Sequence, residues 1–170
     1  MSTGSAQTAI AFTTPFGTLG VEATEDGVRR VRLPGEGRFA SADGSTTSAT
    51  VAQDAAAQLT EYLGGDRHEF ELELDWANVG SEHRHLLEVL CETAPFGVTV
   101  TYGELGRRAG IEDPRDVGTL MGRNPLPLVV PCHRVVAADG LGGYGGGLEL
   151  KRRLLELEGV LPPRLDLGDV

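Results

Sequence analysis

The sequence predicts a mixed α/β (α+β) protein in which a small strand-rich unit precedes a mostly helical one. Short candidate strands separated by turn residues occupy residues 9–33, a pattern typical of a β-meander. After residue 80, apolar residues recur instead at helical spacing. Residues Asp75 to Gly80 separate the two patterns and are expected to form a linker. We therefore expect two domains, residues 1–77 and residues 78–170.

Three strands are expected to open the first domain. Pro15-Phe16-Gly17 and Glu25-Asp26-Gly27 supply turn residues between them. The strands themselves cover Ala9–Thr13, Thr18–Ala23 and Val28–Leu33. Short consecutive strands of this kind predict a β-meander.

One helix and one further strand complete the first domain. Apolar residues recur at helical spacing from Ala49 to Leu63, and Gly64-Gly65 supplies the end of this helix. Between Phe70 and Leu74, apolar residues alternate with glutamates, which predicts a half-buried strand. No residue pattern in this domain indicates chemistry, so we expect its role to be structural.

Helix signals follow one another in the second domain. Ser81 opens a helix with an apolar stripe, and Cys91 follows that stripe, so we expect Cys91 to be a buried core thiol. Thr101 with Glu104 three residues later forms a capping box for a short helix over Gly103–Ala109.

A second short helix and a final long one complete the domain. Asp113 is expected to cap the second short helix, with Pro114 at its first position. Two short helices separated by a tight turn predict a helix-turn-helix, of a winged-helix-like kind. The final amphipathic helix is expected over Leu148–Glu158, and Gly159 ends it.

Composition and charge exclude several classes of protein. A net charge of −10 and a pI near 4.8 argue against broad nonspecific binding of nucleic acid. Residues 1–80 carry 5 cationic and 12 acidic side chains, whereas residues 81–170 carry 10 and 13. Any nucleic-acid surface is therefore expected to be local and to belong to the second domain. No long apolar run and no basic-then-apolar start occur, so we expect a cytoplasmic protein without a membrane span.

The cysteines and histidines argue against a disulfide framework or a metal site. Cys91 and Cys132 are the only two cysteines, and they form no CxxC motif. His83 and His85 could contact a metal, but no cysteine or histidine partner falls at ligand spacing. We therefore expect no metal.

The stretch from Val129 to Val135 contains the most reactive combination in the chain. An apolar, β-branched run predicts a strand that turns at Pro131 and presents Cys132 beside His133. A thiol becomes a nucleophile as its thiolate, and a nearby histidine is the usual acceptor of its proton. From the dipeptide alone, a buried structural cysteine at a strand end stays an open alternative.

Several separate motifs extend this signal over residues 82–160. The motifs are Pro95-Phe96-Gly97, Thr101-Tyr102-Gly103-Glu104-Leu105, Arg115-x-Val117-Gly118, Asn124-Pro125, Pro131-Cys132-His133-Arg134-Val135, Gly142-Gly143-Tyr144-x-Gly146-Gly147 and Lys151-x-x-Leu154-Leu155-x-x-Glu158-Gly159. In order and in spacing they resemble the O6-alkylguanine-DNA alkyltransferase family (methylated-DNA–protein-cysteine methyltransferases). The first domain resembles the variable domain of that family only in outline.

The resemblance implies DNA repair by direct damage reversal. The implied enzyme is a methylated-DNA–protein-cysteine S-methyltransferase, which moves an alkyl group, such as methyl, irreversibly and once per molecule from O6-alkylguanine to Cys132. The target nucleotide would first be flipped out of double-stranded DNA. O4-alkylthymine is a further candidate substrate. No cofactor is implied, the ligands of the zinc found in some members are missing, and we expect a monomer.

The resemblance also implies roles for individual residues. The catalytic set comprises Cys132 as acceptor, His133 as its base through a water, Glu158 as the partner of that histidine, Tyr102 as donor to the leaving guanine, and Asn124 as the residue that holds the turn. The implied DNA-binding residues are Arg115, which would fill the vacated place in the base stack, with Tyr102, Gly118 and Arg123. The implied alkyl pocket is formed by Val135, Tyr144, Gly145 and Gly146.

The chain also departs from the family pattern. Glu112, Asp113 and Asp116 add negative charge around Arg115, which we expect to weaken DNA affinity. Gly145 is smaller than the residue that many members carry, so the pocket is expected to admit groups larger than methyl.

Two other functions are compatible with parts of the pattern. One is a non-catalytic module that binds alkylated DNA and recruits other repair proteins. The other is a cysteine hydrolase that uses Cys132, His133 and Glu158. Retention of the cysteine favours alkyl transfer over the first, and a Cys132→Ala variant that still binds DNA would separate the two.

Overall fold

Three antiparallel strands begin the chain and form a sheet in the order β1-β2-β3. The computed structural model describes residues 6–37 and 39–165. The strands are β1 (Thr8–Thr14), β2 (Gly17–Thr24) and β3 (Gly27–Arg32). The register aligns Ile10 with Val21, and Val21 with Val31, so apolar side chains gather on one face. Each strand lies within one residue of its predicted position.

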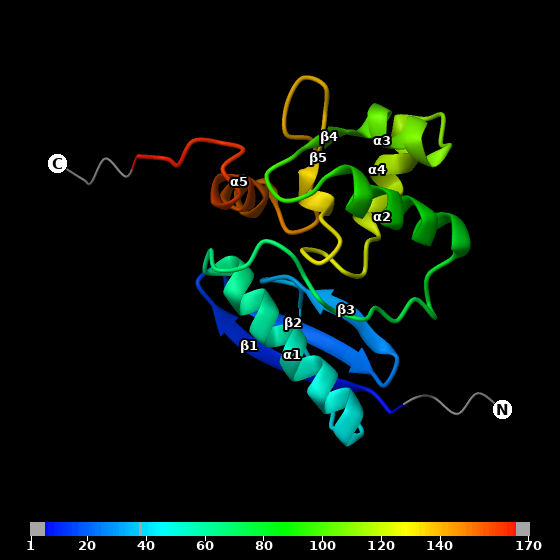
Figure 1. Cartoon of the computed structure of the whole chain (residues 1–170). Helices are drawn as coiled ribbons and strands as arrows, with labels where there is room; N and C mark the ends of the chain where they lie inside the picture. Colours follow the sequence, from blue (N-terminus) through cyan, green and yellow to red (C-terminus); the bar gives the residue numbers. More distant parts are fainter. Residues whose placement is uncertain (1–5, 38, 166–170) are drawn as a thin grey trace.

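Helix α1 (Thr46–Leu63) lies across one face of this sheet (Figure 1). The Ser45 side chain accepts a hydrogen bond from the Ser48 backbone N at 3.1 Å. Because this cap satisfies the first turn, the helix begins three residues before the predicted start at Ala49. The side chains buried at helical spacing include Ala52, Ala55, Leu59 and Tyr62.

The predicted strand between Phe70 and Leu74 is wrong, because only Leu74 makes a bridge to the sheet. Leu74 pairs in parallel with Val28, near the start of β3. Because this pairing is parallel, the residues before Leu74 extend beyond the start of β3, where none of the described strands can pair with them. The Gln58 side chain of α1 partly replaces that partner by bonding the backbone of Glu71.

Helices make up most of the C-terminal part of the chain (Figure 1). They are α2 (Ser81–Thr93), α3 (Tyr102–Ala109), α4 (Pro114–Gly122) and α5 (Leu148–Leu157). The predicted caps are confirmed: the side chain of Thr101 accepts from the Glu104 backbone N at 3.1 Å, and that of Asp113 from the Arg115 backbone N at 2.9 Å. Helices α3 and α4, with the tight turn between them, form the predicted helix-turn-helix.

A short parallel pair, β4 (Val100–Thr101) and β5 (Val135–Val136), brings the second half of this part beside α3. The prediction of a strand through Cys132 is wrong, because residues Cys132–Arg134 form a 3-10 turn before β5. The carbonyl of Val130 accepts from the side chain of Asn124 and from the Cys132 backbone N, so both of its hydrogen bonds are made within this segment.

One apolar core runs through both parts of the chain. Leu19 and Leu59 of the N-terminal part belong to the same buried cluster as Leu87 and Leu154 of the C-terminal part. No helix among the described residues has the length and apolar character needed to cross a membrane.

Cys91 lies on the surface, so the prediction of a buried core thiol is wrong. It borders two surface cavities that are also lined by Leu72 and Leu74. The extended segment before α2 therefore leaves this side of the helix uncovered, although Leu87, one turn earlier, is fully buried.

Candidate active site

The turn that carries Cys132 is held from behind by Asn124. The Asn124 side-chain amide donates to the Val130 carbonyl at 3.0 Å, while its oxygen accepts from the Leu126 backbone N at 2.9 Å. Between these bonds, Leu128 has a φ of 73°, a conformation that is uncommon for a residue with a side chain. A backbone constrained in this way positions the cysteine reproducibly.

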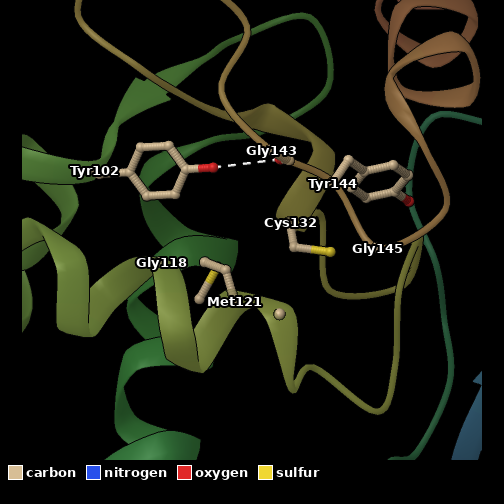
Figure 2. A pocket seen from close by; sticks show the side chains of 8 residues that line it. Tyr102, Gly118, Met121, Cys132, Gly143, Tyr144 and Gly145 are labelled. Atoms are coloured by element: carbon tan, nitrogen blue, oxygen red, sulfur yellow. Dashed lines mark hydrogen bonds between the residues drawn. The ribbon is translucent and has the colours of Figure 1, made fainter.

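The Cys132 side chain lies in a cavity of about 330 Å³. Figure 2 shows Cys132 between Tyr102 and Tyr144, with Gly118 and Met121 of α4 on another side. The full lining consists of Tyr102, Gly118, Met121, Gly122, Cys132, Gly143, Tyr144 and Gly145. Cys132 is only 8% exposed, so this cavity is how a small molecule or a single base would reach the sulfur.

Burial controls the protonation of this thiol. It raises the pKa of Cys132 to about 11, while a hydrogen bond from Asn124 and the charge of Lys151 act in the opposite direction. The thiol is therefore protonated at neutral pH, and its reaction requires a group that removes the proton.

His133 is the adjacent group with that capacity. Its ring is fully buried, and Nε2 lies 2.6 Å from Oε2 of Glu158. Burial lowers the pKa of His133 against the opposing effect of Glu158, so the ring is neutral. A neutral ring that donates from Nε2 to a carboxylate has its lone pair on Nδ1. That Nδ1 atom is buried and has no hydrogen-bond partner among the described residues.

Glu158 is fixed by donors from several segments. Arg134 donates to its two oxygens at 2.7 and 3.0 Å, and the Gly97 backbone N donates at 3.2 Å. The hydroxyl of Tyr62, from the N-terminal part, donates to the Oε2 atom. Burial on its own would raise the pKa of Glu158, but the hydrogen bonds from His133 and Arg134 hold it well below its usual range. Glu158 is therefore an anion in the folded protein.

Lys151 is fully buried and binds the glycine-rich loop (residues 140–147) to β5, which directly follows the turn that carries Cys132. Its ammonium group donates to the carbonyls of Val135 at 2.7 Å and Gly143 at 3.1 Å, and also to the carbonyl of Leu141. Burial lowers the pKa of Lys151 to about 8. The carbonyls keep a positive charge near Cys132, which favours a thiolate there.

Tyr102 closes the side of the cavity opposite Tyr144 (Figure 2). Its hydroxyl donates to the Gly143 carbonyl at 3.3 Å. Its ring lies so close to Gly142, which has a φ of 73°, that a Cβ atom there would come within 2.8 Å of the ring. The glycine-rich loop therefore permits the position of the tyrosine.

The expected DNA-binding residues lie on or beside α4. The side chain of Arg115 is 91% exposed, and its guanidinium is paired with Asp113 at 2.9 Å. Arg123 follows the last residue of the helix and is exposed, and Gly118 lines the cavity. Asp113 thus caps the helix and also binds the arginine that follows it.

The structure brings together most of the predicted site. Cys132, Tyr102, Gly118, Tyr144 and Gly145 share the cavity, whereas His133, Glu158 and Asn124 lie around the turn behind it. Val135 and Gly146 lie outside the cavity lining: Val135 is fully buried in β5, and a Cβ atom on Gly146 would meet the side chains of Leu33 and Leu150.

Sequence reasoning missed residues both in and around this site: Met121, Gly122 and Gly143 line the cavity, and Arg134, Lys151 and Tyr62 contact the groups around it. Arg134 and Lys151 belong to two of the motifs quoted above. Because each stands in a motif that also contains a predicted catalytic residue, they could have been recognised as buried cations of the site. Tyr62 carried no signal, because it lies in a domain in which no chemistry was expected. The prediction that this domain is only structural is therefore incomplete. Among the described residues, no three His, Cys, Asp or Glu side chains are grouped so that they could hold a metal.

Comparison with known proteins identifies relatives for both parts. Residues 10–76 match the family model "6-O-methylguanine DNA methyltransferase, ribonuclease-like domain", and residues 82–160 match "6-O-methylguanine DNA methyltransferase, DNA binding domain". A methylated-DNA–protein-cysteine methyltransferase of Methanopyrus kandleri is 46% identical over 134 residues, which cover 79% of this chain and 97% of that protein. The corresponding protein of Mycolicibacterium paratuberculosis is 38% identical, over 85% of this chain and 87% of that protein.

Solved structures extend the similarity to the fold. The crystal structure of Mycobacterium tuberculosis OGT in complex with DNA has a TM-score of 0.77 and 33% identity, and covers 88% of this chain and 91% of that one. An O6-methylguanine DNA methyltransferase from Methanococcus jannaschii has a TM-score of 0.59 and 27% identity, and covers 95% of this chain and 99% of that one.

Proposed function

The chain belongs to the O6-methylguanine DNA methyltransferase family, and we propose that Cys132 is the residue that accepts the alkyl group. Its function is DNA repair by alkyl transfer, the activity of a methylated-DNA–protein-cysteine methyltransferase. One observation carries the assignment of the acceptor: of the two cysteines in the chain, Cys132 lies in the cavity and Cys91 on the surface.

The proposed reaction is a single in-line displacement at the alkyl carbon on guanine O6. The sulfur of Cys132 forms a bond to this carbon while the bond between carbon and O6 breaks, and the electron pair of that bond leaves with guanine. Guanine then takes up a proton, which restores the unmodified base. The thioether product is stable, so each protein molecule reacts once.

His133 is proposed to take the thiol proton through a water. Its support is the neutral, buried ring with a free Nδ1 lone pair. The imidazolium that forms would be stabilised by the anionic Glu158, which is the arrangement of a catalytic triad. Asn124 is proposed to hold the turn and to lower the pKa of Cys132.

Tyr102 is proposed to donate a proton or a hydrogen bond to the departing guanine, which lowers the cost of negative charge on its ring. Its position in the cavity supports this role. Tyr144 and Gly145 are proposed as the wall of the alkyl pocket, with Val135 and Gly146 shaping it from behind. The absence of a side chain at Gly145 favours groups larger than methyl.

The chain binds DNA, and we propose double-stranded DNA with O6-alkylguanine as its partner and a monomer as its active form. The complex of the M. tuberculosis relative with DNA supports DNA binding by this chain. Because guanine O6 is stacked and paired in a duplex, the nucleotide must rotate outward to meet a buried sulfur. Arg115, exposed at the start of α4, is proposed to take its place in the stack, and Arg123 to contact the backbone.

We propose that the chain divides into two domains, residues 1–77 and residues 78–170. The extents of the two family models, 10–76 and 82–160, support it.

Intact-mass measurement tests the assignment of the acceptor. We expect incubation with a duplex that contains O6-methylguanine to add one methyl group, located on the Cys132 peptide. A Cys132→Ala variant should bind the duplex and gain no mass, while a Cys91→Ala variant should react like the unaltered chain. A methyl group on Cys91, or none on folded protein that binds the duplex, would contradict the proposal.

A further inference from the structure

Tyr62, in the N-terminal part of the chain, contacts the buried charged cluster that Glu158 forms with Arg134 and His133 behind Cys132. Its side chain is fully buried in the last turns of α1. The ring packs against Phe70 and edge-on against Phe96, with ring centroids 5.4 and 6.4 Å away. These contacts orient the hydroxyl, which donates to Glu158 Oε2 and lies 3.3 Å from His133 Nε2.

The hydroxyl shares one carboxylate oxygen with the histidine. Burial raises the pKa of Tyr62 well above its usual value, so the phenol keeps its proton and acts as a donor. Oε2 of Glu158 then accepts from Tyr62, from His133 Nε2 and from Arg134, whereas Oε1 accepts from Arg134 and the Gly97 backbone. A carboxylate oxygen divided among three donors attracts each of them less than an undivided one.

We propose that Tyr62 is a positioning residue for alkyl transfer, which holds Glu158 Oε2 in place and limits the negative charge that this oxygen presents to His133. The inference rests on the proposed role of His133 as the base for Cys132. It makes the N-terminal part a contributor to the site, because α1 supplies the hydroxyl.

The consequence concerns the protonation of His133. The charged and titratable groups that face this ring are Glu158, Tyr62, Arg134, Lys151 and Cys132. Burial, Arg134 and Lys151 keep the ring neutral, and Glu158 opposes them. Removal of the Tyr62 hydroxyl leaves Oε2 with fewer donors, so the imidazolium becomes more favourable and the neutral base is present only at higher pH.

The test is the pH dependence of single-turnover methyl transfer in a Tyr62→Phe variant, with protein in excess over a duplex that contains O6-methylguanine. We expect the acid limb of the rate profile to move up by about one pH unit, which makes transfer about tenfold slower below that limb. Above it, the rates of variant and unaltered chain should converge. The titration of the His133 ring, followed by ¹⁵N NMR on free protein, should move in the same direction.

A matched control removes another buried hydroxyl, one that contacts the opposite end of α1. Thr8 of β1 and Ser48 in the first turn of α1 share a hydrogen bond of 2.7 Å, whereas Tyr62 lies in the last turn of this helix. A Thr8→Val variant should leave the acid limb in place. An acid limb that is unmoved or lowered in Tyr62→Phe, or that moves equally in Thr8→Val, overturns the proposal.

A measurement on the unaltered chain covers the case in which Tyr62→Phe does not fold. The ¹⁵N shifts of neutral His133 should report the tautomer with the proton on Nε2. A proton on Nδ1 would mean that Tyr62 donates to the histidine instead of sharing Glu158, and would overturn the inference. A failure of the proposed function is distinguishable, because it would appear as no methyl gain in the unaltered chain, whereas the NMR titration needs no DNA.

Discussion

Replacement of Glu158 by glutamine provides a quantitative test of the buried charge network. The variant keeps nearly the same shape but removes the negative charge that faces Arg134. The Glu158 side chain is fully buried and that of Arg134 is 7% exposed, so water cannot take over the lost interaction. Glu158→Gln therefore leaves a buried guanidinium without a counter-charge.

The expected cost follows from this burial. Removal of one partner of a buried ion pair costs about 3–5 kcal/mol, because the remaining charge stays uncompensated. For a chain of 170 residues this corresponds to a fall in Tm of roughly 8–14 °C. A matched surface pair gives the comparison: Arg84 and Glu88 lie 2.9 Å apart with both side chains nearly half exposed. Glu88→Gln should change the free energy of unfolding by about 0.5 kcal/mol or less.

Thermal and chemical unfolding at several pH values would measure both variants. Because the folded-state pKa of Glu158 is lowered, its contribution is fully present above the pKa of an unfolded glutamate, near 4.3, and is lost as the pH falls below that value. The difference in stability between the unaltered chain and Glu158→Gln should therefore be constant around pH 7 and shrink in acid.

A second substitution separates the cost of the unpaired Arg134 guanidinium from other contributions to the loss of stability. If the cost arises from the unpaired guanidinium, adding Arg134→Met to Glu158→Gln should recover much of it, since an apolar side chain of similar length then fills the site. Equal costs for Glu158→Gln and Glu88→Gln, or no recovery in the double variant, would refute the reasoning.

Two further variants test the start of α4 and the glycine-rich loop. Asp113→Asn keeps the helix cap but weakens the ion pair that holds Arg115. Affinity for duplex DNA, measured by fluorescence anisotropy, should therefore rise several-fold at low salt and less at high salt. An unchanged affinity at low salt would contradict this expectation. Gly142→Ala places a Cβ atom 2.8 Å from the ring of Tyr102 at a positive φ, so stability should fall by at least about 1 kcal/mol and methyl transfer should slow. Gly140→Ala, which meets open space, is the control for the loop, and an equal loss there would contradict the explanation.

Local chemistry made much of the fold predictable. The caps at Thr101 and Asp113 were confirmed because a cap depends only on residues within one turn of the chain. The three strands were confirmed because the turn residues that separate them act over a few positions. The strand expected before Leu74 failed for the opposite reason, since a strand needs a partner, and β3 begins too late to provide one.

Part of the candidate site was likewise predictable from the sequence, and part was not. The family resemblance carried by the motifs implied that Cys132, His133 and Glu158 act together, and the structure places His133 Nε2 2.6 Å from Glu158 Oε2. The exposure of Cys91 was not predictable, because helical periodicity places a residue on a face but does not say whether another segment covers that face.

The sequence alone was therefore sufficient for the helices, the first strands and the family, because these depend on short-range propensities and on motif order. Only the folded chain shows that Tyr62 and His133, 71 positions apart, share the carboxylate of Glu158. Glu158 itself lies 96 positions after Tyr62. No local pattern encodes such a contact. It arises when α1 and the segment around Cys132 bury apolar side chains in one core, which leaves the Tyr62 hydroxyl beside a carboxylate that water cannot reach.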